Sequence, residues 1–278
     1  IPILQNCEIR RQTHTGIQEK VALVTGSSDK VGIGLAIAKN LAQRGCSIVL
    51  HGSRDADKVE DIREDLQSQY EVPVHYFRAD FDKMNEVEGL YNMIEDIYSD
   101  GIDILFNNAG IVQNESVDET GIEMWEKTLR VNLTSAFYLT NLSLPGMKRK
   151  GWGRVVNISS GLGIKAMPDM CGQVTSKHGM NGLTKTVALE TSGTGITCNA
   201  ICPALAMTEA LASSIRSLVE KTGMPFEEIK NSLVTSVNPS GKLLDINKIG
   251  EVAAFLCSSS ANEITGVILP VDWGYAAK

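Results

Sequence analysis

The chain has few aromatic residues and no excess of positive charge. Aromatics make up 5% of the 278 residues, and 33 acidic residues outnumber 26 basic ones, which gives a net charge of -7. Nonspecific nucleic-acid binding requires a basic surface, so the composition argues against that class of function. The hydrophobic fraction of 43% is ordinary for a globular protein. We expect no nucleic-acid partner.

Long apolar runs are missing as well. No stretch approaches the ~18 apolar residues that a membrane-spanning helix needs. Residues 1–19 contain no apolar segment of the kind found in a secretory signal. We therefore expect no membrane partner and a cytoplasmic location. The chain begins at Ile1 rather than Met, which leaves the removal of a leader open.

The cysteines and histidines form no recognisable metal-binding or disulfide pattern. The four histidines make no ligand motif, and the six cysteines include no CxxC pair: Cys7, Cys46, Cys171, Cys198, Cys202 and Cys257. In a chain of this size, scattered cysteines are typical of reduced, buried thiols. Cys198 and Cys202 would share one face of a strand that ran that far. We predict no metal site.

Short β-branched runs bounded by glycine alternate with longer helical segments, and no repeat or linker interrupts them. We predict one domain over residues 19–278, preceded by a polar surface arm over residues 1–18. The expected strands are Lys20–Gly26, Ser47–Gly52, Val72–Ala79, Asp103–Asn107, Gly153–Ser159, Gly195–Ile201 and Gly266–Val271. The expected helices are Gly32–Arg44, Asp55–Gln69, Lys83–Tyr98, Met124–Lys150, Gly172–Glu190 and Asn247–Ser258, with two more over Thr208–Ser236 broken near Gly223–Pro225.

This alternation predicts an α/β fold with a doubly wound, parallel, seven-stranded sheet and helices on both faces. Right-handed crossovers and a switch point after the third strand give the strand order 3-2-1-4-5-6-7. A ligand of such a sheet binds at the carboxyl ends of the central strands. The first strand runs directly into Gly26 and then into Gly32-Ile33-Gly34 before a helix. Glycines there let the backbone approach a pyrophosphate, which the helix N-terminus attracts.

Further motifs follow the glycine loop in order: Asp80-Phe81, Asn107-Asn108-Ala109-Gly110, Asn132, Ser160, Lys177, Pro203 and Thr208. With them the sequence resembles the short-chain dehydrogenase/reductase family over residues 19–276. Within that family it looks most like the 3-hydroxybutyrate dehydrogenases, notably in Gly151-Trp152-Gly153-Arg154, Lys177-His178-Gly179 and Ala200-Ile201-Cys202-Pro203. The resemblance implies a Rossmann-type fold, a nicotinamide dinucleotide cofactor and oxidoreductase activity.

The resemblance also implies the residues that would bind the dinucleotide. Asp80 would hydrogen-bond the adenine, Lys177 the nicotinamide ribose, and Thr208 the carboxamide or phosphate. The full set is Gly26, Ser28, Lys30, Gly32, Ile33, Gly34, Arg54, Asp80, Phe81, Asn108, Ala109, Gly110, Lys177, Pro203 and Thr208. Taken singly, Asp80 also suits a helix N-cap, and Asn107–Gly110 a strand-ending turn. The loop is longer than the family's usual one, with five residues between Gly26 and Gly32, and Ala204 replaces a preferred glycine.

The end of the second strand bears on the choice between NADP and NAD. It carries Arg54 and no carboxylate for a ribose 2′-hydroxyl. Arg54, helped by Lys30, could pair with a 2′-phosphate, and we therefore favour NADP over NAD. Alternatively, Arg54 is a solvated residue that opens a helix.

The family's proton donor is absent. The resemblance assigns Ser160, Asn132 and Lys177 to the catalytic set, and it places a tyrosine four residues before the lysine, where this chain has Gln173. An amide donates hydrogen bonds but has no proton to transfer at accessible pH. General acid–base catalysis is typically worth about 10²–10⁴-fold, so its loss leaves a feeble catalyst. The alternative is a substitute donor, either a water on Lys177 or the phenol of Tyr275.

The substrate side departs from the 3-hydroxybutyrate dehydrogenases too, because Val112, Leu162 and Met170 stand where those enzymes clamp a carboxylate. Burying a carboxylate there without partners would cost several kcal/mol. We predict an apolar pocket lined by Val112, Leu162, Met167, Met170, Leu205 and Trp273, which otherwise are ordinary core.

Two hypotheses follow. The first, which we favour, is a degenerate oxidoreductase scaffold that binds an apolar or conjugated small molecule, NAD(P), or both. The second is an active NADP-dependent oxidoreductase of apolar ketones or alcohols. The helices Met124–Lys150 and Gly172–Glu190 resemble those through which family members associate, so we expect a homodimer or homotetramer.

Overall fold

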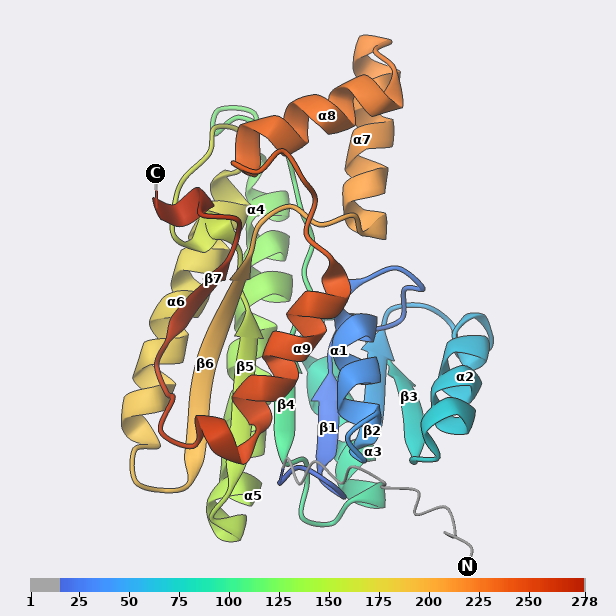
Figure 1. Ribbon diagram of the computed structural model, residues 1–278, viewed down its shortest axis with the longest axis vertical. Coiled ribbons are helices and arrows are strands. Elements are labelled where there is room, and N and C mark those ends of the chain that lie inside the picture. Colours follow the sequence, from blue (N-terminus) through green and yellow to red (C-terminus); the bar gives the residue numbers. More distant parts are fainter. Residues whose placement is uncertain (1–15, 278) are drawn as a thin grey trace, which may run out of the picture.

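A computed structural model describes residues 16–277 of the chain, and its centre is a sheet of seven parallel strands (Figure 1). The strands lie in the order β3-β2-β1-β4-β5-β6-β7, which confirms the predicted order. Their bounds are β1 (Val21–Val24), β2 (Ser47–Gly52), β3 (Val74–Arg78), β4 (Ile104–Asn107), β5 (Gly153–Ile158), β6 (Ile196–Pro203) and β7 (Ile268–Val271). Every residue of β1, β4, β5 and β6 is buried, as expected for strands covered on both faces.

Helices cover both faces of the sheet and form two cores. One core joins the sheet to α1 (Ile33–Ala42), α2 (Glu60–Tyr70) and α9 (Ile246–Cys257). The other joins it to α3 (Met84–Ile97), α5 (Ser135–Lys150) and α6 (Cys171–Glu190). The helices α7 (Glu209–Thr222) and α8 (Phe226–Val237) stand beyond the carboxyl end of the sheet (Figure 1). They confirm the predicted break near Gly223–Pro225.

Two predicted helices are interrupted. The helix expected over Met124–Lys150 consists of α4 (Ile122–Leu129), a π-helical turn at Arg130–Thr134, and α5. The segment Asp55–Gln69 contains a short 3-10 turn, Ala56–Lys58, before α2 begins. Further 3-10 turns lie at Gly161–Gly163, Ser259–Ala261 and Tyr275–Ala277. Alternating helical geometry leaves little trace in the hydrophobic periodicity, which explains the difference.

Most of the expected N-terminal arm, residues 1–15, lies outside the described residues. Ile17 is fully buried, and its carbonyl oxygen accepts a hydrogen bond from Cys46 Sγ. The polar surface arm therefore does not extend as far as Ile17. No helix among residues 16–277 is long and apolar enough to cross a membrane.

Cys198 and Cys202 both lie within β6, with even spacing that places them on one face, and both are buried. All cysteines in the described part of the chain are free. Burial raises the pKa of the Cys198 thiol to about 12. Across residues 16–277 no group of histidine, cysteine and carboxylate side chains could hold a metal ion.

Candidate active site

The glycine loop is held close to the turn that follows β4. Gly26 has a φ of +62°, and a Cβ built on it would lie 2.9 Å from the Ala109 Cα. A Cβ on Gly34 would lie 2.4 Å from the Gly26 carbonyl oxygen. Both positions therefore require glycine on steric grounds. Despite its extra length, the loop therefore packs closely against the turn that follows β4.

Thr25 and Asn108 fasten this loop to the Asn-Ala-Gly turn. The Thr25 hydroxyl accepts hydrogen bonds from the backbone N–H groups of Asn108 and Ala109, both at 2.9 Å. In return, Asn108 Nδ2 donates to the carbonyl oxygens of Thr25 and Gly26. The Asn108 side chain is thus a brace within the protein. Thr25 was missed by the sequence reading, and its place directly after β1 was the available signal.

The N-terminus of α1 suits a phosphate group. Gly32 is the N-cap, no described side chain caps the helix, and its first turn contains no acidic residue. The first N–H groups of the helix are therefore available to an anion, and the helix dipole favours one there. Gly32, Ile33 and Gly34 thus fit the pyrophosphate of a dinucleotide. Ser28, in the same loop, is buried.

His51, at the end of β2, supports the loop and was not predicted. The Gly26 N–H donates to His51 Nδ1 at 3.2 Å, which leaves Nε2–H to donate to the Ala79 carbonyl oxygen at 3.1 Å. The ring stacks on Phe81 with a centroid separation of 4.0 Å. Burial lowers the pKa of His51 to about 4. The histidine is therefore neutral at physiological pH and acts as a fixed spacer.

Phe81 and Asp80 are neighbours in the chain, but the first is buried and the second is exposed. Phe81 is buried against His51, so its ring belongs to the core and not to a dinucleotide surface. Asp80 has an exposed carboxylate, which accepts from the backbone N–H of Asp82 and faces Lys83 Nζ at 3.7 Å. Asp80 is not the N-cap of α3, since that position is Lys83.

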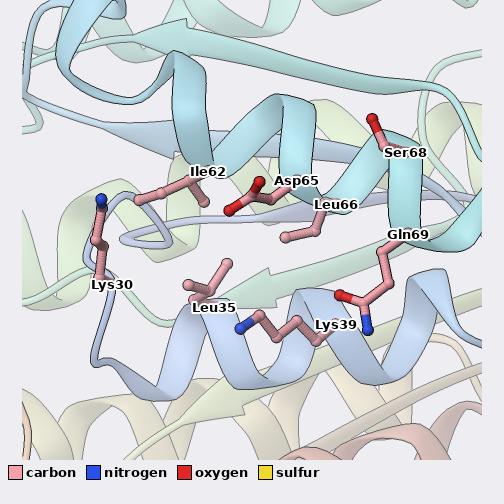
Figure 2. A pocket seen from close by; sticks show the side chains of 8 residues that line it. All are labelled: Lys30, Leu35, Lys39, Ile62, Asp65, Leu66, Ser68 and Gln69. Carbon is pink, nitrogen blue, oxygen red and sulfur yellow. The ribbon is translucent and has the colours of Figure 1, made fainter.

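Arg54 and Lys30 have different ion-pair partners. Arg54 forms an ion pair with Asp29 of the glycine loop and donates to the Ser28 carbonyl oxygen. Lys30 faces Asp61 on α2 at 3.8 Å. A hollow of about 500 Å³ lies beside Lys30, and its walls include Lys39, Asp65 and Gln69. Figure 2 shows Lys30 at one end of these side chains, between α1 and α2. Lys30 and Arg54 therefore face different carboxylates in the structure.

Asn132 and Gln173 form the centre of the predicted catalytic set. Asn132 is fully buried in the π-helical turn, a kind of irregularity often found at functional sites. Its Nδ2 donates to Gln173 Oε1 at 3.0 Å and to Ser176 Oγ at 3.3 Å. Gln173 lies in the first turn of α6. The structure thus joins two of the four predicted catalytic residues by a direct hydrogen bond.

Lys177 and Ser160 complete the set. Lys177 is one turn after Gln173 on α6, and its Nζ donates to the Ile158 carbonyl oxygen at 2.7 Å. Burial lowers the pKa of Lys177 to about 8, partly offset by Cys202. Ser160 lies two residues after the end of β5, and its Oγ accepts from the Leu162 N–H at 3.1 Å. A Cβ on Gly110 would lie 3.8 Å from Lys177 Nζ, so Lys177 adjoins the Asn-Ala-Gly turn after β4.

Tyr275 lies at the edge of this set. A Cβ on Gly161 would be 3.0 Å from Tyr275 Cδ1, so the ring packs beside the residue that follows Ser160. Lys165 Nζ lies 5.3 Å from the centroid of the same ring. Asp272 fixes the turn that carries Tyr275 by accepting from the N–H groups of Gly274 and Ala276.

The predicted pocket residues are unevenly exposed. Val112 is 48% exposed and Trp273 is 52% exposed, which is unusual for ordinary core. Leu162, Met167, Met170 and Leu205 are half-buried.

Two predicted cofactor-binding residues, Pro203 and Thr208, lie between β6 and α7. Pro203 ends β6, and Thr208 caps α7 by accepting from the Leu211 N–H. The Glu209 N–H donates to the Val31 carbonyl oxygen, which ties α7 to the glycine loop.

The family model described as short chain dehydrogenase matches residues 20–218, and the chain belongs to that family. The D-beta-hydroxybutyrate dehydrogenase of Cupriavidus necator is 40% identical over 93% of this chain and 98% of its own length. The enzyme of the same name from Rhizobium meliloti is 36% identical, with coverages of 93% and 99%.

Solved structures agree with the fold. The L-sorbose reductase of Gluconobacter frateurii, complexed with NADPH and L-sorbose, superposes with a TM-score of 0.87 at 28% identity, covering 93% of this chain and 97% of that one. A variant actinorhodin polyketide ketoreductase with NADPH gives a TM-score of 0.85 at 30% identity, with coverages of 94% and 98%. The chain thus has the scaffold of nicotinamide-dependent oxidoreductases.

Proposed function

We propose that this protein binds a nicotinamide dinucleotide beside an apolar small molecule and turns that molecule over slowly or not at all. The dinucleotide, when bound, supplies or accepts hydride at its nicotinamide ring. Gly26, Gly34 and the open N-terminus of α1 would hold its phosphates, and Lys177 would lie near its nicotinamide end. Val112 and Trp273 would bound the apolar molecule.

The observation that carries the proposal is the fixed amide of Gln173. At the position where the resemblance places a phenol, Asn132 holds a group that neither gives nor takes a proton. The Lys177 ammonium, which would acidify a phenol, is instead bonded to the Ile158 carbonyl oxygen. Hydride transfer without a matched proton transfer loses about 10²–10⁴-fold in rate.

Three measurements test this proposal. NADPH, NADP, NADH and NAD are titrated against the full chain, following nicotinamide and tryptophan fluorescence. Turnover is then measured with apolar ketones and alcohols, and an absorption spectrum of the purified protein checks for a bound chromophore. We expect dinucleotide binding with little turnover. Failure to bind any of the four, or turnover at the rate of an ordinary reductase, would contradict the proposal.

A second function, slow carbonyl reduction, is favoured by the position of Tyr275. Its ring lies beside Gly161, one residue from Ser160. Tyr275→Phe removes the phenol and keeps the packing. Activity that is lost in Tyr275→Phe and in Ser160→Ala, but retained in Gln173→Ala, would support this function over the first.

We further propose that the cofactor is NADP, with Arg54 pairing with its 2′-phosphate. The two NADPH-bound reductases of similar fold support this choice. In the absence of a phosphate, Asp29 holds Arg54 within the loop. The 2′-phosphate would therefore have to displace the Asp29 carboxylate from the guanidinium group.

Self-association and location are proposals as well. Phe137 on α5 and Leu189 on α6 are 52% and 79% exposed, which supports a homodimer or homotetramer through these helices. Analytical ultracentrifugation of the full chain and of Phe137→Ser/Leu189→Ser tests that assembly. The free thiols of the described residues support a cytoplasmic location, which imaging of a tagged full chain would check.

A further inference from the structure

Lys177 is a buried amine that lacks a counter-ion. It is 5% exposed, and its Nζ donates to the Ile158 carbonyl oxygen at 2.7 Å. Within residues 16–277, the one titratable group whose charge acts on it is the Cys202 thiol of β6, and no carboxylate does so. Burial raises the pKa of that thiol, so the thiol is uncharged near neutral pH. An unpaired buried cation is costly, and the pKa of Lys177 is accordingly lowered to about 8.

The residue one helical turn before Lys177 does not supply the missing charge. The Ile111 N–H donates to Asn132 Oδ1 at 2.8 Å, and Asn132 Nδ2 donates to the Ile111 carbonyl oxygen at 2.9 Å. The Gln173 atom that meets Asn132 Nδ2 at 3.0 Å is therefore the acceptor, Oε1. A phenolate or carboxylate at this position would hold the lysine in its charged form, whereas a glutamine carries no charge. Gln173 thus favours the neutral amine.

Gly110 leaves one side of this amine uncovered. Gly110 is exposed, and a Cβ built on it would lie 3.2 Å from Asn132 Oδ1 and 3.8 Å from Lys177 Nζ. Any side chain at position 110 would therefore touch both groups, and glycine has none. When Lys177 is neutral, one hydrogen can still donate to the Ile158 carbonyl oxygen, and the nitrogen keeps its lone pair. The structure therefore combines a poorly solvated amine with an open approach to it.

We propose that Lys177 Nζ captures an apolar aldehyde as an imine. This inference rests on the proposed function, whose apolar small molecule it defines as an aldehyde. The neutral nitrogen adds to the carbonyl carbon, so that a C–N bond forms and the carbonyl oxygen becomes a hydroxyl. That oxygen then leaves as water with both hydrogens of the amine, and a C=N bond remains. Nothing is oxidised or reduced, so the step needs no further reagent.

Benzaldehyde with sodium cyanoborohydride tests the proposal on the full chain, because the added hydride converts an imine into a stable secondary amine. Peptide mapping by mass spectrometry then compares Lys177 with Lys185, which is exposed on the same helix. At pH 7 an amine with a pKa of about 8 is neutral far more often than an ordinary lysine. Lys177 should therefore be labelled about tenfold faster than Lys185.

The ratio of the two labelling rates should also depend on pH. Above pH 8 Lys177 is mostly neutral already, whereas an ordinary exposed lysine still gains neutral form as the pH rises. The ratio of Lys177 to Lys185 labelling should therefore fall above pH 8. A purely structural role for Lys177 would not produce this profile.

Gln173→Glu is the matched variant, because it places a carboxylate one helical turn from Lys177. The carboxylate should raise the pKa of Lys177 and lower the labelling ratio at pH 7 by about tenfold. The control is Gln69→Glu on the exposed side of α2, which should keep the wild-type ratio. Circular dichroism checks that both variants fold, and if Gln173→Glu unfolds, the pH profile of the wild-type chain still decides the matter.

Labelling of Lys177 no faster than that of Lys185, or a ratio that does not change with pH, would overturn the inference. Saturating NADP should slow the labelling, because the proposed function places the nicotinamide end of the dinucleotide beside Lys177. Unchanged labelling in the presence of NADP would contradict that placement, whereas labelling without NADP tests the capture itself. The failure of the inference and the failure of the proposed function are therefore distinguishable.

Discussion

The two walls of the candidate site differ in what builds them. The first wall, where we propose that the dinucleotide binds, consists of the loop after β1 and the turn after β4. It is mainly backbone held by Thr25 and Asn108. The opposite wall, on α6, depends on the end groups of individual side chains, above all Gln173. A longer glycine loop leaves the first wall's close approach intact. A single residue change is enough to alter the chemistry of the second.

The largest effect is expected when the tyrosine that the family resemblance places at position 173 is introduced. In Gln173→Tyr, a hydroxyl would lie within reach of Ser160 and one helical turn from Lys177. If the backbone wall is intact, turnover of an apolar alcohol should rise by about 10²–10⁴-fold in an assay of nicotinamide absorbance. Gln173→Phe supplies the same ring without the hydroxyl and should stay inactive. An equal rate in both variants would show that more than the proton donor is missing.

The next test disturbs the close packing of the glycine loop in the first wall. In Gly34→Ala the new methyl group would lie 2.4 Å from the Gly26 carbonyl oxygen and 2.7 Å from Asn108 Nδ2. Moving backbone out of the way should cost about 1–3 kcal/mol of unfolding free energy and weaken dinucleotide binding by about a hundredfold. The control is Gly182→Ala on α6, which meets nothing within 4 Å. Wild-type affinity in Gly34→Ala would show that the loop does not carry the binding.

A pH titration tests the role of His51, which accepts a hydrogen bond from the backbone N–H of Gly26 in that wall. His51 has a pKa of about 4 in the folded chain, against an ordinary value of 6.5 for histidine. Below pH 6.5 the unfolded chain gains a proton that the folded chain refuses, so stability falls as the pH drops. The loss should reach about 3 kcal/mol near pH 4 in urea titrations.

In His51→Asn the pH dependence should flatten between pH 6.5 and 4. The exposed residue His178 provides the control, since His178→Asn should follow the wild-type profile. An unchanged profile in His51→Asn would rule out His51 as the source of the acid sensitivity.

The smallest effect concerns cofactor choice at the Arg54–Asp29 pair. Asp29→Asn removes the competing carboxylate, so the ratio of NADP to NAD affinity should rise about tenfold. Arg54→Ala should lower the same ratio. Lys39→Ala, on the α1–α2 hollow, is the matched cationic control and should not change it. Fluorescence titration with both cofactors measures each ratio, and insensitivity to Arg54→Ala would exclude the proposed phosphate contact.

The sequence predicted the sheet order because each strand is a short apolar run bounded by glycine or a turn residue, and right-handed crossovers then leave few topologies. It did not predict the π-helical turn at Arg130–Thr134, because one extra residue in a helical turn barely changes the apolar periodicity. It also placed Ile17 in a surface arm, since an isolated apolar residue beside polar neighbours carries no signal of burial.

The sequence suggests site residues where residue type alone indicates a role, as for Lys177, Ser160 and the loop glycines, and these roles stay predictions. The sequence did not predict that Phe81 stacks on His51, because this contact depends on how two strands end side by side. It did not predict that Lys30 faces Asp61, because a long flexible side chain can reach either of two neighbours. The direction of the Gln173 amide required three hydrogen bonds that no linear spacing encodes.

The π-helical turn also makes this protein sensitive to chain length. An α-helix advances by about 100° per residue, so deleting one residue between Arg130 and Thr134 would rotate α4 relative to α5 by roughly that angle. Asn132 would swing out of line with Gln173 although every functional side chain remained in the sequence. Among homologues of equal composition, a gap at this turn would therefore separate those with an aligned amide pair from those without one.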